Sequence, residues 1–213
     1  MIASFSWPRL HRVLPALDWL RRQRVPLALA ALALLAWPLR SVLEASMSLH
    51  MLVQFPLVIA LGCVLAGALP ARWRERTQGW NTYGIAGLTA CALVLSVLMI
   101  PRLLDLALVH PVVAAGKWLA LLACGAALQL SWRRAGLVVQ GFFLGNVLPM
   151  MGVAGQLYQD SPLRLCNAYL LQDQLWLGQA LVVLAVAVAV VWIAAAMRSL
   201  MRSSQTLPAE AQP

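Results

Sequence analysis

Apolar residues are grouped along the chain in six long blocks, separated by short breaks rich in charged, polar or proline residues. Each block holds about twenty residues, the length that an α-helix needs to cross a ~30 Å hydrocarbon layer. A lipid-facing β-strand alternates apolar and polar positions, and these blocks are apolar throughout. The pattern predicts six membrane-spanning helices, at 25–43, 49–69, 82–100, 106–130, 135–156 and 175–197.

The composition excludes a soluble fold. Hydrophobic residues make up 62% of the 213 positions and charged residues 11%, with a mean hydropathy of +0.80. Soluble domains carry about 25% charged residues, and disordered chains are still more polar. We therefore expect an all-α integral membrane protein with one polytopic domain over residues 25–197.

The two ends of the chain differ from this domain. In residues 1–24, arginines alternate with Trp7 and several leucines, which is typical of an amphipathic helix on a membrane surface. Residues 198–213 are polar and contain proline, so a disordered tail is expected there.

The basic residues predict an orientation. The net charge is +9, and twelve of the 16 basic residues precede the first block or follow the second, fourth and sixth. Basic loops stay in the cytoplasm during membrane insertion, so both termini are expected there. In a bacterial inner membrane the opposite ends of the helices then face the periplasm. We read the charge as topology and contact with lipid, not as a nucleic-acid site.

Several metal-binding side chains are expected at the periplasmic ends of the helices. Met47, His50, Met51 and Gln54 are spaced i, i+3, i+4 and i+7, so they share one helix face. Other candidates are expected at the same depth, namely His110, Asn146, Met150, Tyr169, Asp173 and Gln174.

Thioether sulfur and imidazole nitrogen are ligands that suit Cu(I). The candidate copper ligands are Met47, His50, Met51, His110, Met150 and Asp173. Two other interpretations stay open. Methionines are ordinary packing residues in apolar helices, and His50 and His110 on different helices are able to clamp one haem iron.

Lys117 is the only basic residue deep inside a block, seven positions after His110. A charge at this depth is costly and indicates a functional role by default. No Asp or Glu lies in the middle of any block, so no carboxylate partner is expected. Asn146, backbone carbonyls or snorkelling of the long side chain to the interface are the alternatives.

Other chemistry receives no support from the sequence. The four cysteines show no CxxC spacing, and three of them lie inside apolar blocks, which argues against a disulfide framework or a zinc site. No nucleophile–base pair or acid pair is visible, so we do not expect an enzyme.

Three segments resemble CtaG-type cytochrome c oxidase assembly factors, a polytopic family. Residues 46–57 resemble its HMxxHML…PL segment, with Ser46 in place of the first histidine. Residues 100–111 resemble a loop that leads to an "HP" pair at a helix start, here His110-Pro111. Residues 141–178 resemble its "LY…L.DQ..G" ending. Such factors usually have one more span than is counted here.

The resemblance implies a non-enzymatic factor that helps to install copper in a haem-copper oxidase at the periplasmic face. The partner would then be an oxidase subunit or another membrane complex. A single-haem electron-transfer subunit and a structural subunit without metal stay open as alternatives.

Overall fold

The computed structural model describes residues 14–77, 79–166 and 168–205, and within these residues it contains helices and no strand. This confirms the predicted all-α class. The elements are α1 (Leu14–Ala36), α2 (Arg40–Leu43), α3 (Met47–Leu49), the π-helix η2 (His50–Gln54), α4 (Phe55–Gly67), α5 (Ala71–Arg76), α6 (Ile85–Leu98), α7 (Pro101–Val109), α8 (Pro111–Ser131), α9 (Leu137–Asp160) and α10 (Leu171–Gln205).

Four helical stretches of the described chain are long and apolar enough to cross a membrane: Met47–Gly67, Pro111–Ser131, Leu137–Asp160 and Leu171–Arg202. The pair α6–α7 provides a fifth candidate, because the two helices pass the same criterion together although they meet at a bend of 76°. The part of α1 from Gln23 to Ala36 is a shorter apolar helix. Four or five spans are therefore supported, and the predicted sixth remains a prediction.

Two predicted blocks are divided differently in the structure, in both cases at a proline. The block 25–43 is not one helix, because α1 ends at Ala36 and α2 starts only after Pro38. Proline lacks an N–H group and disfavours the α conformation of the residue before it. Similarly, residues 106–109 belong to α7, and the long helix α8 starts at Pro111 after the extended residue His110.

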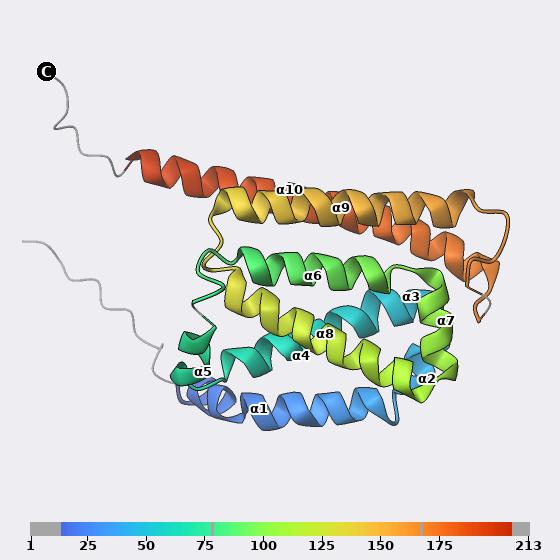
Figure 1. Ribbon diagram of the computed structural model, residues 1–213, viewed down its shortest axis with the longest axis horizontal. Helices are drawn as coiled ribbons and strands as arrows, with labels where there is room; N and C mark the ends of the chain where they lie inside the picture. Colours follow the sequence, from blue (N-terminus) through green and yellow to red (C-terminus); the bar gives the residue numbers. More distant parts are fainter. Residues whose placement is uncertain (1–13, 78, 167, 206–213) are drawn as a thin grey trace, which may run out of the picture.

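The helices form a layered bundle (Figure 1). The long helices α9 and α10 lie side by side, α4, α6 and α8 form the middle, and α1 covers the opposite side. At one end, here named the α7 end, α7 lies across the bundle near α2 and α3. At the other end, named the α5 end, lie α5, the start of α1 and the end of α10.

Glycines allow two helix pairs to approach closely. A Cβ atom at Gly125 of α8 would lie 2.0 Å from the Ile59 carbonyl oxygen of α4, and one at Gly62 would lie 2.3 Å from the Leu122 oxygen. Between α9 and α10, Gly155 and Gly178 meet in the same way. Small residues at such contacts are typical of helix packing in membranes, where dispersion contacts replace the hydrophobic effect.

The terminal segments complete the comparison with the sequence. Helix α10 continues to Gln205, so residues 198–205 of the predicted tail are helical, and α1 starts at Leu14, within the predicted amphipathic segment. The remainder of those two segments, residues 1–13 and 206–213, lies outside the described residues.

Candidate functional site

The candidate site begins in a single turn of π-helix between α3 and α4. The backbone N–H of Phe55 donates to the carbonyl of His50, five residues earlier. Pro56 follows directly and has no N–H group to continue the regular ladder, which favours such a local widening. Met47, His50, Met51 and Gln54 are all buried, as their spacing predicts. Single π turns of this kind frequently occur at functional sites.

Both ring nitrogens of His50 have partners from distant segments. Nε2 lies 2.8 Å from Lys117 Nζ of α8, and Nδ1 lies 2.6 Å from the hydroxyl oxygen of Tyr169 in the loop between α9 and α10. An ammonium group has only donors, so Nε2 is the acceptor and Nδ1 carries the proton that is donated to Tyr169. The ring also packs edge-on against Phe55, with ring centroids 5.4 Å apart.

Lys117 has a carboxylate partner, contrary to the expectation from the sequence. Its Nζ donates to Glu44 Oε1 at 2.9 Å, and Arg40 Nε donates to Glu44 Oε2 at 2.8 Å. Glu44 lies outside every apolar block. The helix is interrupted at Pro38, and the short helix α2 that follows brings Glu44 to the first turns of α8. We name this continuous series the polar chain, formed by Arg40, Glu44, Lys117, His50 and Tyr169.

The polar chain leads from the surface into the bundle. The exposed fraction falls from 36% for the Arg40 side chain to 9% for Glu44 and 3% for Lys117, and His50 is fully buried. Burial raises the pKa of Glu44, but the hydrogen bonds from Arg40 and Lys117 outweigh this effect and hold that pKa below its ordinary value of 4.5. Glu44 is therefore an ionised carboxylate at neutral pH.

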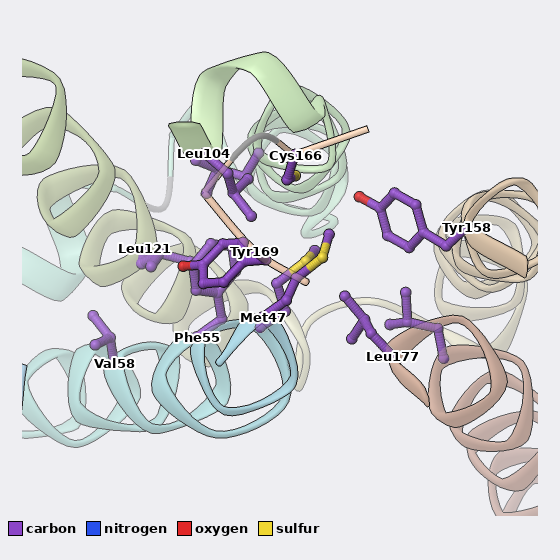
Figure 2. Close-up of a cluster of buried hydrophobic side chains, with 12 residues drawn as sticks. Met47, Phe55, Val58, Leu104, Leu121, Tyr158, Cys166, Tyr169 and Leu177 are labelled. Carbon is purple, nitrogen blue, oxygen red and sulfur yellow. The ribbon is translucent and has the colours of Figure 1, made fainter. Parts of the chain in front are cut away.

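Three sulfur-bearing side chains lie in the hydrophobic core around Tyr169. Met47 and Met51 of α3 and η2 and Cys166 of the α9–α10 loop are buried in one cluster. Figure 2 shows Met47, Cys166 and the Tyr158 ring arranged around the same region of the core. The Cys166 thiol donates to the Pro101 carbonyl at 3.7 Å, and burial raises its pKa to about 12, with Asp105 adding to the effect. Cys166 is thus a thiol, not a thiolate, at neutral pH.

Gln54 is buried with neither end of its amide paired. It is fully buried, and neither Oε1 nor Nε2 has a hydrogen-bond partner among the described residues. A buried polar group without a partner is unfavourable and is an exception in native structures. Gln54 lies one turn further along the helix than His50, at the end of η2.

Two predicted residues at the start of α10 connect this helix to its neighbours. Gln174 Oε1 accepts from the Leu165 backbone N–H at 2.8 Å, and its Nε2 donates to the Tyr158 carbonyl at 3.1 Å. The Asp173 carbonyl accepts a hydrogen bond from Ser48 at 3.5 Å. Asp173 thus connects α10 with α3 through its backbone, and Gln174 positions the loop.

The structure does not bring the other predicted residues to His50. His110 is exposed and extended just before α8, not one turn inside a helix as the block pattern predicts. The Met150 sulfur accepts from the Ser96 hydroxyl at 3.0 Å, between α9 and α6. Asn146 is exposed and donates to the Phe142 carbonyl of its own helix at 2.7 Å.

A cavity of about 380 Å³ lies beside the polar chain, between α6, α7 and α8. Its lining is apolar except for Lys117 and includes Leu104, Ala107 and Gly116. The side chain of Lys117 therefore borders two environments, the polar chain and an apolar cavity.

The sequence analysis missed Arg40, Glu44 and Cys166 as members of this site. The i, i+4 spacing of Arg40 and Glu44 was the available signal, since such a spacing favours an ion pair. Among the described residues, no group of three or more His, Cys, Asp and Glu side chains is arranged to hold a metal ion. A comparison of the chain with protein-family models, curated proteins and solved structures finds no match.

Proposed function

We propose that this protein is a non-enzymatic membrane factor that carries Cu(I) at the α7 end of its helical bundle. The observation that supports this most directly is the gathering of Met47, His50, Met51 and Cys166 in and around one buried cluster. Thioether, thiol and imidazole groups bind Cu(I) in preference to harder metal ions. Copper is then the cargo of the protein and not a catalytic cofactor.

The arginine distribution supports an orientation for this cargo site. Arg72, Arg74, Arg76, Arg133 and Arg134 lie in or beside the segments that connect the helices at the α5 end. By the positive-inside rule we place the α5 end in the cytoplasm of a bacterial cell and the α7 end toward the periplasm. The site would therefore receive and release copper on the periplasmic side of the inner membrane.

A haem-copper oxidase is the partner that we propose for the released copper. This part of the proposal is supported by the resemblance of residues 46–57, 100–111 and 141–178 to CtaG-type assembly factors. The π turn with His50 and Met51 falls within the first of these segments, and Gln174 falls within the last.

The two alternatives receive less support from the geometry. A haem clamp needs both histidines at one iron, but His50 is fully buried and His110 is exposed just before α8. A structural subunit would offer its small-residue contacts to a partner. The closest contacts of this kind, at Gly62, Gly125, Gly155 and Gly178, are made inside the bundle, although Gly145 and Gly152 of α9 have no neighbour within 4 Å.

Copper binding by the purified protein tests the proposal. We expect bound Cu(I) in the wild type without a Soret band, and loss of that copper in Met47→Leu/Met51→Leu and in Cys166→Ser. The matched control is Met197→Leu/Met201→Leu, because those methionines are exposed on α10. Full copper content in the first two variants would contradict the proposed site, and a Soret band would favour the haem alternative.

The cellular counterpart is the yield of active oxidase in low-copper medium. Cells that carry Met47→Leu/Met51→Leu should assemble less active oxidase than the wild type, and added copper should restore part of it. Normal oxidase assembly in low-copper medium would show that these methionines have no role in oxidase maturation, even if the protein binds copper.

A further inference from the structure

The cavity between α6, α7 and α8 has the size and the lining of a site for a small apolar molecule. Its volume is about 380 Å³, which lies within the range of ligand pockets in proteins. The described residues that line it are leucine, valine, alanine and glycine, with Lys117 as the one polar side chain. Ligand pockets typically combine such an apolar wall with a few polar groups that orient the ligand.

Lys117 has a hydrogen-bond donor to spare at this wall. An ammonium group carries three N–H donors. In the described structure two of them have partners, Glu44 Oε1 at 2.9 Å and His50 Nε2 at 2.8 Å. Lys117 is only 4% exposed, so bulk water does not reach the third donor freely. A buried donor without a partner is unfavourable, and a ligand with an acceptor atom in the cavity would satisfy it.

The cavity is accessible from the outer surface of the bundle. Its lining residues Leu93 and Val97 of α6 are 62% and 50% exposed, and Gly116 of α8 is exposed as well. Helix α8 is a candidate span, and α6 belongs to the bent pair that is the fifth candidate. The outer surface of these helices would face lipid, so a molecule that enters the cavity from this side is itself soluble in the bilayer.

The surroundings of Lys117 select the chemistry of the acceptor. Glu44 already neutralises Lys117, and Arg40 binds the other Glu44 oxygen nearer the surface. An anionic headgroup on the same ammonium would bring a second negative charge close to Glu44, and like charges repel. A hydroxyl group would bring a donor of its own, and no lining side chain accepts a hydrogen bond. A neutral carbonyl oxygen, which only accepts, meets neither objection.

We propose that this cavity binds a membrane quinone in its oxidised form, with a quinone carbonyl accepting the third N–H of Lys117. A quinone is neutral and soluble in lipid, and it carries carbonyl oxygens on an apolar ring with an apolar tail. The reduced quinol should bind more weakly, because its hydroxyl groups find no acceptor among the lining side chains. The inference does not rest on the proposed copper function.

Titration of the purified full-length protein with decylubiquinone in detergent tests the inference, because a ligand that binds the folded state raises the midpoint of thermal unfolding. The midpoint of the wild type should rise. Gly116→Leu should lose this rise, because its side chain fills the cavity and its Cβ meets nothing within 4 Å. Ala115→Leu is the matched control, since Ala115 is exposed and does not line the cavity. Lys117→Met should need at least tenfold more quinone for the same rise, because the charged donor is absent.

Decylubiquinol and palmitate test the chemistry of the acceptor. Decylubiquinone should raise the midpoint at a lower concentration than either of them. No rise in the wild type, an equal rise in Gly116→Leu, or a stronger effect of the quinol or of palmitate would overturn the inference. The Cu(I) content of Gly116→Leu should equal that of the wild type. Failure of the quinone site and failure of the proposed copper function are therefore separate results.

Discussion

His50 takes its position and its proton arrangement from residues that lie far apart in the sequence. Lys117 and Tyr169 hold its two nitrogens, and Phe55 packs against its ring. Lys117 and Tyr169 belong to different segments, so the two hydrogen bonds of His50 form only after the helices have packed. Individual hydrogen bonds therefore hold the site together, and substitutions that remove one hydrogen-bonding atom or one charge should show how much each bond stabilises the fold.

Tyr169→Phe removes one oxygen and leaves the buried Nδ1–H of His50 without its acceptor. An unsatisfied buried donor costs about 1–3 kcal/mol. We expect a lower midpoint of thermal unfolding in detergent. Tyr83→Phe is the matched control, because Tyr83 is exposed and its hydroxyl should matter little. Equal midpoints for the two variants would argue against the His50–Tyr169 hydrogen bond.

Glu44→Gln removes the carboxylate that neutralises the buried Lys117 ammonium. Breaking a buried ion pair in this way costs roughly 3 kcal/mol. The folded-state pKa of Glu44 lies below its ordinary value of 4.5, so the ionised carboxylate stabilises the fold fully above pH 4.5. That contribution is lost as the pH falls through the lowered pKa.

The pH profile of this variant therefore has a defined sign. The stability difference between wild type and Glu44→Gln, followed by thermal unfolding, should be constant from pH 7 down to about 4.5. It should shrink at lower pH, where Glu44 itself becomes protonated. A difference that grows as the pH falls would show that Glu44 is not held ionised by its neighbours.

At the scale of the elements, close helix contacts place the polar chain. Helices α4 and α8 pack through Gly62 and Gly125, and this contact fixes the relative position of η2 and the first turns of α8. His50 and Lys117 belong to those two segments. The site therefore depends on a packing contact several turns away from it.

Gly125→Ala should separate these helices, because the added Cβ would lie 2.0 Å from the Ile59 oxygen. Such overpacking costs about 1–3 kcal/mol or more. Gly116→Ala is the control on the same helix, since its Cβ would meet nothing within 4 Å. Thermal unfolding should show a loss for the first variant only. Similar midpoints would mean that α4 and α8 do not approach as closely as described.

The lengths of the apolar blocks predicted the long helices but missed their internal divisions. Both ends of α9 and the start of α10 lie within about four residues of the predicted blocks, because long apolar runs leave little choice, whereas α10 continues to Gln205, beyond the predicted end at 197. The breaks at Pro38 and His110 were missed, because the surrounding residues are as apolar as those in a span. Prolines, not polarity, divide the helices there.

At the scale of the whole molecule, the charged α5 end and the α7 end define an axis (Figure 1). The proposed orientation predicts that positions at the two ends differ in accessibility from outside the cell. Leu163→Cys in the loop at the α7 end should react with a membrane-impermeant thiol reagent in intact cells, in a variant without native cysteines. Glu75→Cys in α5 should react only after permeabilisation. The reverse pattern would show that the orientation is opposite to the proposed one, with the proposed copper site on the cytoplasmic side.

The candidate site was predictable only where it is local in sequence. Met47, His50 and Met51 lie within one and a half turns, so their common face followed from spacing alone. The partners of His50 did not, because Lys117, Tyr169 and Glu44 reach it through the packing of separate segments. Likewise, His110 and Met150 were assigned by depth, and depth does not determine the direction in which a side chain points.

The bend between α6 and α7 also has a consequence for the surrounding lipid. Helix α6 has 14 residues, which span only ~21 Å at 1.5 Å per residue. This is shorter than a ~30 Å hydrocarbon core, whereas α9 with 24 residues exceeds it. A bilayer thins locally to match a short hydrophobic segment. Lipid beside α6 and α7 should therefore be thinner than lipid beside α9 and α10. Headgroups and water would then reach deeper on that side, where the cavity and Lys117 lie.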